Sequence, residues 1–299
     1  MLISKISGFE RPFGVRASEE DGFYVVDIKS GLLTRIRSDF TRAWASAGSP
    51  AMQGPHSVAV GVNGTIYVTE FYGRRLRCFL PDGSEAGTLA APTVDMPWLL
   101  TAPAGIEIFP DDMIIVADYG SHTLQRFFPD GSFDAWHDGT TRWRSDGAPS
   151  CVASKDGFDR VHAAIPMPDG RMLVADTWQH RMRIFDSKGS PDSLIGGPVA
   201  SSNMGMFNAP VSIALLPDGF VVSEYENPRL QYFNFDGQVH SWLGVDQNGV
   251  PPDNWRYDNV VVNSSDVLGG FWHPYDVKPY GNGLVVADTD NARIQCITF

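Results

Sequence analysis

Two histidines and one tyrosine stand at matching places in a pattern that repeats along the chain. His56, His162 and Tyr275 each follow the residue that opens a repeat, in the second, fourth and sixth copies. If alternate repeats surround a common axis, these side chains approach it with near-threefold symmetry. Such an arrangement suits a divalent metal, because catalytic zinc commonly takes three protein ligands and keeps one position open. We therefore expect His56 and His162 to bind a divalent metal, either zinc or calcium.

The third position of this set holds a tyrosine in place of a third imidazole. His273 and Asp276 lie close to Tyr275 in the sequence, so three side chains are available to complete the coordination of the metal or to move protons. We expect Tyr275, Asp276 and His273 to be catalytic. The alternative is that the two histidines line a polar channel that holds only water or a ligand.

Aromatic residues in the loops of the same pattern are candidates for binding a substrate beside these groups. They are Tyr72, Tyr119, Trp178 and Tyr225 in short loops, with Trp143 and Trp255 in the two longest connections. The long connections, residues 136–147 and 242–259, are rich in Trp, Arg and Asp. Long loops on a rigid scaffold are usual places for function. We expect them to rise around the channel and to form an aromatic cup; the alternative is that they are lids without a role.

These residues are positioned by six copies of one strand pattern. Its central strand is apolar and ends in an acid: FYVVD (23–27), IYVTE (66–70), IIVAD (114–118), MLVAD (172–176), FVVSE (220–224) and LVVAD (284–288). A strand that is apolar on both faces must be buried on both faces. A β-propeller provides this burial, because the middle of each blade packs between two neighbouring blades. We predict an all-β, six-bladed β-propeller with four-stranded antiparallel blades.

The terminal acids of these strands recur in every copy, whereas a catalytic site breaks symmetry. We expect them to accept backbone N–H groups of the loop that follows each strand. The last copy stops after its third strand, and LISKI (2–6) is an alternating segment ahead of the first copy. We predict that this segment adds the missing outer strand to the last blade, because ring closure removes an exposed edge.

Two segments resemble the core of the NHL repeat, namely ADTWQHRMRIF (175–185) and ADTDNARIQCI (287–297), and PHSVAV (55–60) and PYDV (274–277) resemble its opening strand. The similarity covers nearly the whole chain and implies one NHL-type propeller domain over residues 1–299. NHL-type propellers include the peptidyl-hydroxyglycine amidating lyases, which hold zinc with three histidines on inner strands. His56 and His162 match two of those positions, and Tyr275 departs from the third.

Composition narrows the classes of partner. The 23 basic and 35 acidic residues give a net charge of −12, which repels phosphate backbones and argues against nucleic acid. No apolar run is long enough for a membrane helix, no signal peptide is evident, and three cysteines are too few for a disulfide framework. We expect a cytoplasmic protein. It is either a metal-assisted lyase or hydrolase acting on a small molecule, or a non-catalytic scaffold that binds a protein, a peptide or a small ligand.

Overall fold

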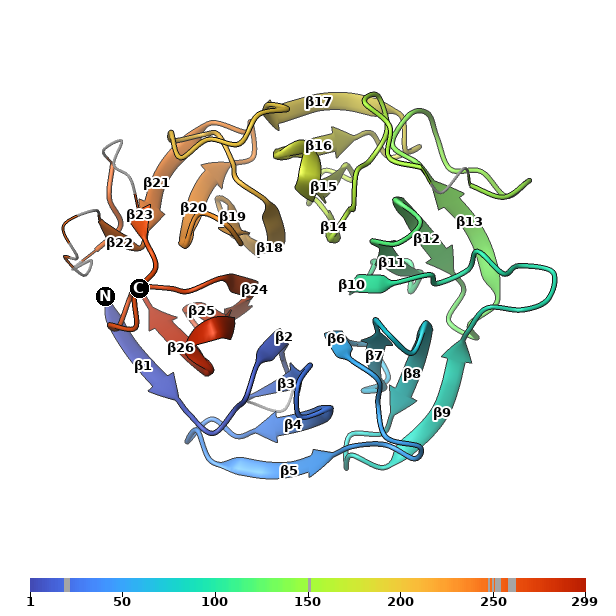
Figure 1. The fold of residues 1–299 in the computed structure, drawn as a ribbon, viewed down its shortest axis with the longest axis horizontal. Coiled ribbons are helices and arrows are strands. Elements are labelled where there is room, and N and C mark those ends of the chain that lie inside the picture. Colours follow the sequence, from blue (N-terminus) through green and yellow to red (C-terminus); the bar gives the residue numbers. More distant parts are fainter. Residues whose placement is uncertain (19–21, 150–151, 247, 249, 251–253, 258–261) are drawn as a thin grey trace.

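Figure 1 shows a ring of β-sheets around a central channel, as the sequence predicts. The structure is a computed structural model that describes residues 1–18, 22–149, 152–246, 248, 250, 254–257 and 262–299. Over these residues the ring contains six antiparallel sheets of four strands each. No helix in the described part of the chain is long and apolar enough to cross a bilayer.

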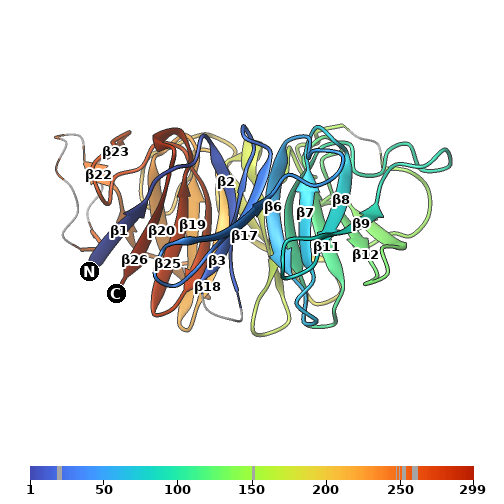
Figure 2. The same cartoon turned by 90° about the horizontal axis from the view of Figure 1, so that it is seen from below.

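The strands fall into four concentric layers (Figures 1 and 2). The innermost strands are β2 (Pro12–Ala17), β6 (Pro55–Val60), β10 (Pro103–Ile108), β14 (Ala163–Pro166), β18 (Pro210–Leu216) and β24 (Pro274–Tyr280). The second layer is β3 (Phe23–Asp27), β7 (Ile66–Glu70), β11 (Ile114–Asp118), β15 (Met172–Asp176), β19 (Gly219–Glu224) and β25 (Gly283–Asp288).

The outer two layers complete the blades. The third layer is β4 (Leu32–Ile36), β8 (Arg75–Phe79), β12 (Thr123–Phe127), β16 (Arg181–Phe185), β20 (Arg229–Asn234) and β26 (Arg293–Thr298). The periphery is β5 (Arg42–Ser46), β9 (Glu85–Ala90), β13 (Phe133–His137), β17 (Pro191–Gly196), β21 (Val239–Leu243) and β1 (Leu2–Ile6). A small hairpin, β22 (Val245–Asp246) and β23 (Val262–Asn263), and two single turns of 3-10 helix, η1 (Thr177–Gln179) and η2 (Thr289–Asn291), lie outside the blades.

The ring closes through the N-terminal strand. β1 pairs antiparallel with β26, in a register that places Ile3 opposite Ile297 and Ile6 opposite Ile294. The N- and C-termini consequently lie side by side at the rim of the ring (Figure 1). This confirms the predicted closure.

Burial of the middle strands also follows the prediction. Every residue of β3, β7, β11 and β15 is buried, because both faces of these strands pack against neighbouring blades. In one such seam, Val25 of the first blade packs in a cluster with Val285 and Ala287 of the last. Cys78 and Cys296 are buried in the third layer, and burial raises their thiol pKa values to about 11 and about 12. Cys151 lies outside the described residues.

The acids that end the second-layer strands are structural, but their partners differ from the expected ones. Each accepts a backbone N–H 16 or 17 residues earlier, in the connection that leads into its own blade. The pairs are Asp27 with Glu10 and Arg11, Glu70 with Gln53, Asp118 with Thr101 and Ala102, Asp176 with Asp159, Glu224 with Asn208, and Asp288 with Trp272. Among the described residues, only Asp27 also binds backbone N–H groups of the loop that follows it. Each acid therefore fixes the backbone of the segment that connects the preceding blade to the inner strand of its own blade.

Candidate functional site

A cavity of about 280 Å³ opens at the end of the central channel where the inner strands begin, and we call it the mouth cavity. Aromatic rings dominate its described lining: Phe13, Phe71, Tyr72, Tyr119, Trp178, Tyr225 and Tyr275, together with His56 and His162. Five of the described residues also line the narrow space deeper in the channel: Phe13, His56, His162, Val211 and Tyr275. The three that carry polar atoms in their side chains, His56, His162 and Tyr275, are called the floor of the mouth cavity below.

β-Bulges at the start of β6 and β24 bring two of the floor residues, His56 and Tyr275, into the channel. In β6 the pairing register shifts between Pro55 and Ser57, and in β24 it shifts between Pro274 and Asp276. A bulge inserts one extra residue and re-aims side chains that would otherwise alternate between faces. As a result, His56 and Ser57 both line the channel, as do Tyr275 and Asp276.

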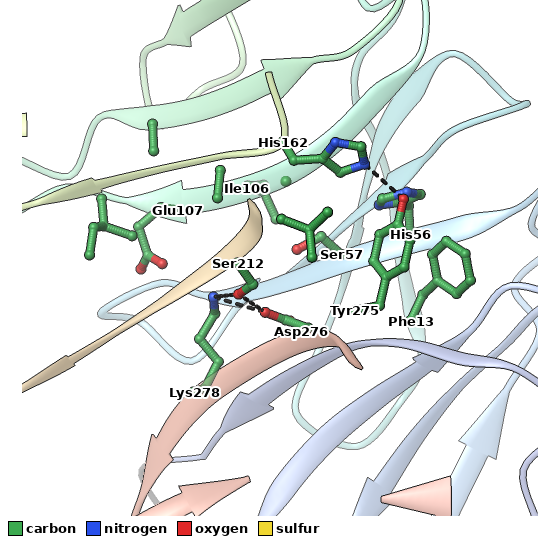
Figure 3. A pocket seen from close by; sticks show the side chains of 15 residues that line it. Phe13, His56, Ser57, Ile106, Glu107, His162, Ser212, Tyr275, Asp276 and Lys278 are labelled. Atoms are coloured by element: carbon green, nitrogen blue, oxygen red, sulfur yellow. Dashed lines mark hydrogen bonds and ion pairs between the residues drawn. The ribbon is translucent and has the colours of Figure 1, made fainter. Parts of the chain in front are cut away.

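His162 and Tyr275 form a hydrogen-bonded pair in this floor (Figure 3). The Tyr275 hydroxyl lies 2.7 Å from Nε2 of His162, and the Thr177 hydroxyl lies 3.2 Å from Nδ1. Thr177 donates its single hydroxyl proton to the Pro210 carbonyl, at 2.7 Å, so its oxygen accepts the Nδ1–H of His162. Nε2 is then the unprotonated nitrogen, and it accepts the proton of Tyr275.

The floor is uncharged at neutral pH. Burial lowers the pKa of His162 to about 4. Burial, followed by the proximity of His162, holds the pKa of His56 well below 6.5, while burial raises the pKa of Tyr275 well above 10. The three rings pack closely, with centroids 5.7 Å apart for the two histidines and 5.1 Å apart for His56 and Tyr275. Both imidazoles are therefore neutral and keep one unprotonated nitrogen, and their lowered pKa values make them weak bases.

The donor set does not fit the predicted zinc or calcium ion. The Nε2 lone pair of His162 already accepts a hydrogen bond from Tyr275, and the raised pKa of Tyr275 opposes its use as a phenolate ligand. Calcium prefers six to eight oxygen ligands, which two imidazoles and a phenol do not supply. Within the described residues, no group of three His, Cys, Asp or Glu side chains is placed to hold a metal. Metal binding stays an untested prediction, and we derive no chemistry from it.

Asp276 lies below the floor, in an ionic layer deeper in the channel (Figure 3). Its carboxylate accepts the N–H of Val15 at 2.9 Å, the hydroxyl of Ser212, and Lys278 Nζ at 3.1 Å. In the same region, Arg16 of the first blade reaches Glu107 of the third at 2.7 Å. These bonds join separate blades across the channel, so Asp276 serves as a brace beneath Tyr275.

The other predicted residues are divided between the mouth cavity and its rim. Tyr72, Tyr119, Trp178 and Tyr225 all line the cavity, and Trp178 Nε1 donates to the Tyr119 hydroxyl at 3.2 Å. His273 does not line it. Its ring stacks on Tyr225 with centroids 4.1 Å apart, and its Nδ1 lies 2.5 Å from the carboxylate of Asp290.

Trp143 and Trp255 lie elsewhere, contrary to the expected cup. Arg144 bridges to Trp136 at the end of β13, and Arg256 bridges to Trp242 at the end of β21. Each long connection therefore turns back along the outer strand of its blade. Trp143 consequently lines a cleft with Arg126 and Met172, and Trp255 lines a groove with Tyr232 and Phe299. Part of the second connection, including residues 251–253 and 258–261, lies outside the described residues.

Sequence reasoning missed several residues of the mouth cavity, although a signal for most of them was present. Phe13 occupies the same repeat position as His56. The residue directly after the terminal acid also lines the cavity in five of the six blades: Ile28, Phe71, Tyr119, Thr177 and Tyr225. Arg11 carries no such repeat signal. Aligning the copies on their acids would have identified this second ring of positions.

Comparison with solved structures shows the same fold at low identity. Virginiamycin B lyase from Staphylococcus aureus has a TM-score of 0.62 and 11% identity over 100% of this chain and 99% of its own. A gluconolactonase candidate has a TM-score of 0.64 and 13% identity over 98% and 90%. An auxiliary nutrient binding protein from Bacteroides ovatus has a TM-score of 0.69 and 12% identity over 96% and 69%. No protein-family model and no curated protein matches the chain.

Proposed function

We propose that the protein is an enzyme that cleaves a bond in a small molecule held in the mouth cavity, as a lyase or a hydrolase. The observation that carries the proposal is the Tyr275–His162 hydrogen bond, whose direction Thr177 sets, at the floor of an aromatic cavity. Buried ionisable groups with displaced pKa values in a cleft are typical of catalytic sites.

The hydrogen-bond direction defines a proton relay. A substrate C–H, or a water molecule attacking the substrate, gives its proton to the Tyr275 oxygen as Tyr275 passes its own proton to Nε2 of His162. The imidazolium that forms donates through Nδ1–H to Thr177. General base catalysis of this kind contributes typically 10²–10⁴-fold to the rate.

The leaving group needs a proton donor, and Tyr119 is placed to supply it. Its oxygen already accepts the N–H of Trp178, so its own proton is free for a ligand. The ring of Tyr119 lies 5.0 Å from that of His162, centroid to centroid. An acid and a base from separate blades thus face the same cavity.

The names of the structural neighbours support both catalysis and its alternative. One neighbour is a virginiamycin B lyase, and a form of it with one histidine replaced by alanine is described as catalytically inactive. Another neighbour is a nutrient binding protein, and the seven aromatic rings of the mouth cavity would also serve binding without turnover. We favour the enzyme, because the Tyr275–His162 hydrogen bond gives the cavity a route along which a proton can pass.

Turnover of a small panel tests the proposal. Gluconolactone, quinupristin and the aryl lactone dihydrocoumarin would each be incubated with the protein and followed by mass spectrometry. We expect cleavage of at least one compound, and about a 10²-fold slower reaction in Tyr275→Phe and His162→Gln, the size of one acid–base contribution. Tyr232→Phe and His240→Gln, which lie in the groove beside Trp255, are the matched controls.

Two outcomes would change the account. Binding of a panel compound with no product, in wild type and variants alike, would favour the scaffold. Activity that is lost in EDTA and restored by zinc would support the metal-assisted reaction that the sequence predicts, and would refute the metal-free relay.

A further inference from the structure

The described lining of the mouth cavity contains no acidic side chain, although the chain as a whole is acidic. With a net charge of −12, the protein has no carboxylate among the described residues that line the cavity, and Arg11 is its charged lining residue. The acid beside this arginine, Asp290, pairs with Arg11 and with His273. A ligand in the cavity therefore meets no lining carboxylate, and it meets Arg11 already paired with Asp290.

A second cation, Arg160, stands over the cavity wall. Its guanidinium lies 5.2 Å from the ring centroid of Tyr119 and 5.6 Å from that of Trp178. Arg160 is exposed, and it makes no ion pair with any residue that the structure describes. Its charge is thus available to a ligand that enters between these two rings.

The hydrogen-bonding groups of the wall point to the same kind of ligand. Trp178 gives its N–H to Tyr119, and Tyr119 keeps its own hydroxyl proton for another acceptor. Arg11 gives one N–H to Asp290 at 3.1 Å and retains further donors. The wall therefore offers spare donors and few acceptors, which suits a ligand rich in acceptor oxygens.

The aromatic faces argue against a cationic ligand. Aromatic cages commonly bind quaternary ammonium groups through the ring faces. Here the protein's own arginines already cover such faces, because Arg11 lies 5.3 Å from the ring centroid of Phe13 and Arg160 covers Tyr119 and Trp178. A bound cation would find these faces occupied and would be repelled by both guanidinium groups.

We propose that the mouth cavity takes a small carboxylate with a flat ring. The ring lies among the aromatic side chains that line the cavity, and the carboxylate lies at Arg160, beside Tyr119 and Trp178. Arginine suits this role, because its planar guanidinium binds a carboxylate through two parallel hydrogen bonds. The inference rests on the mouth cavity being the site of the proposed function, and it names the class of substrate for that site.

Calorimetry with three probes of one shape tests the inference: 2-naphthoate, its uncharged amide 2-naphthamide, and the cation (2-naphthylmethyl)trimethylammonium. We expect 2-naphthoate to bind about tenfold more tightly than the amide, as for a charge-assisted hydrogen bond, and the cation to bind most weakly. Arg160→Gln should abolish the preference for the anion while leaving the affinity for the amide within about twofold. Arg142→Gln, an exposed arginine outside the cavity lining, is the control for the loss of one charge.

Each remaining outcome would overturn the inference. Equal affinity for anion and amide, stronger binding of the cation, or a preference that survives Arg160→Gln would each contradict it. Failure of all three probes to bind would also contradict it. The measurement requires no turnover. A wild-type protein that prefers the anion but cleaves no compound of the panel would refute the proposed catalysis and leave the inference intact.

Discussion

The blade loops and the mouth cavity both bury polar groups, but the hydrogen bonding of those groups differs between the two regions. In the blade loops, Glu224 accepts bonds from Asn208, Asn227, Arg229 and Gln231, so its carboxylate is fully satisfied. The anchoring of an incoming connection by a terminal acid recurs in all six blades. In the mouth cavity, by contrast, the residues at equivalent positions vary around the ring, and the hydroxyl proton of Tyr119 lacks a partner among the described residues.

This difference separates stability from function. Networks that repeat in every blade reflect a structural need that every blade shares. The mouth cavity keeps a donor such as the Tyr119 hydroxyl facing the open cavity, where a ligand can use it. The following predictions test that separation, beginning with the largest expected effect.

Removing a loop acid should damage stability and spare the mouth cavity. Glu224→Ala leaves Arg229 buried without its partner, since both side chains are almost fully buried. Breaking a buried ion pair from one side costs about 3–5 kcal/mol of unfolding free energy. Denaturant unfolding would measure this loss, and Glu226→Ala, an exposed acid two residues away, should stay within about 0.5 kcal/mol of wild type. If folded Glu224→Ala protein lost its binding of 2-naphthoate, the loop acids would contribute to ligand binding as well as to stability, and the distinction between the two regions would be wrong.

Lowering the pH should reduce the free energy of unfolding through the buried histidines of the mouth cavity. The pKa of His162 is about 4 in the folded protein, and an unfolded histidine titrates near 6.5. Between these values the unfolded chain binds more protons, so the free energy of unfolding falls as the pH drops from about 6.5 to 4. His162 alone accounts for about 3 kcal/mol of this fall.

The variant His162→Gln isolates that contribution. Unfolding curves would be recorded for both proteins from pH 7 to pH 4. We expect the variant to lose stability less steeply in this window and to show no altered pH dependence above it. Parallel curves for the two proteins would contradict the buried, neutral state of His162.

The smallest change in the free energy of unfolding should come from removing the hydrogen bond between Tyr275 and His162. Tyr275→Phe removes the donor to Nε2 of His162 and leaves a buried acceptor without its partner. The expected loss is about 1–2 kcal/mol of unfolding free energy. Tyr232→Phe is the control. A loss as large as that of Glu224→Ala would mean that the floor of the mouth cavity is a structural brace like the blade loops.

Most of the fold followed from the sequence, because it depends on local patterns. Apolar strands such as IIVAD (114–118) have to be buried on both faces, and the repeat count then gives the number of blades. The alternating segment Leu2–Ile6 was sufficient to predict closure. The NHL assignment and the cytoplasmic location stay predictions.

The site was predicted only in part. His56, His162 and Tyr275 come together because their positions in the repeat are equivalent. Trp143 and Trp255 do not join them, because Arg144 and Arg256 pair with the outer strands of their own blades, and no repeat position encodes these pairings. The direction of the Tyr275–His162 bond depends on Thr177 and Pro210, so it becomes visible only in three dimensions.

The central claim is that the floor of the mouth cavity holds a neutral proton relay with the His162 proton on Nδ1. Nitrogen-15 NMR of the histidine rings at pH 6 tests it most directly, with His162→Gln to assign the signals. The account predicts a neutral His162 ring with a protonated Nδ1 and a hydrogen-bonded, unprotonated Nε2 whose shift changes in Tyr275→Phe. A ring that is protonated at pH 6, or that carries its proton on Nε2, would contradict the account.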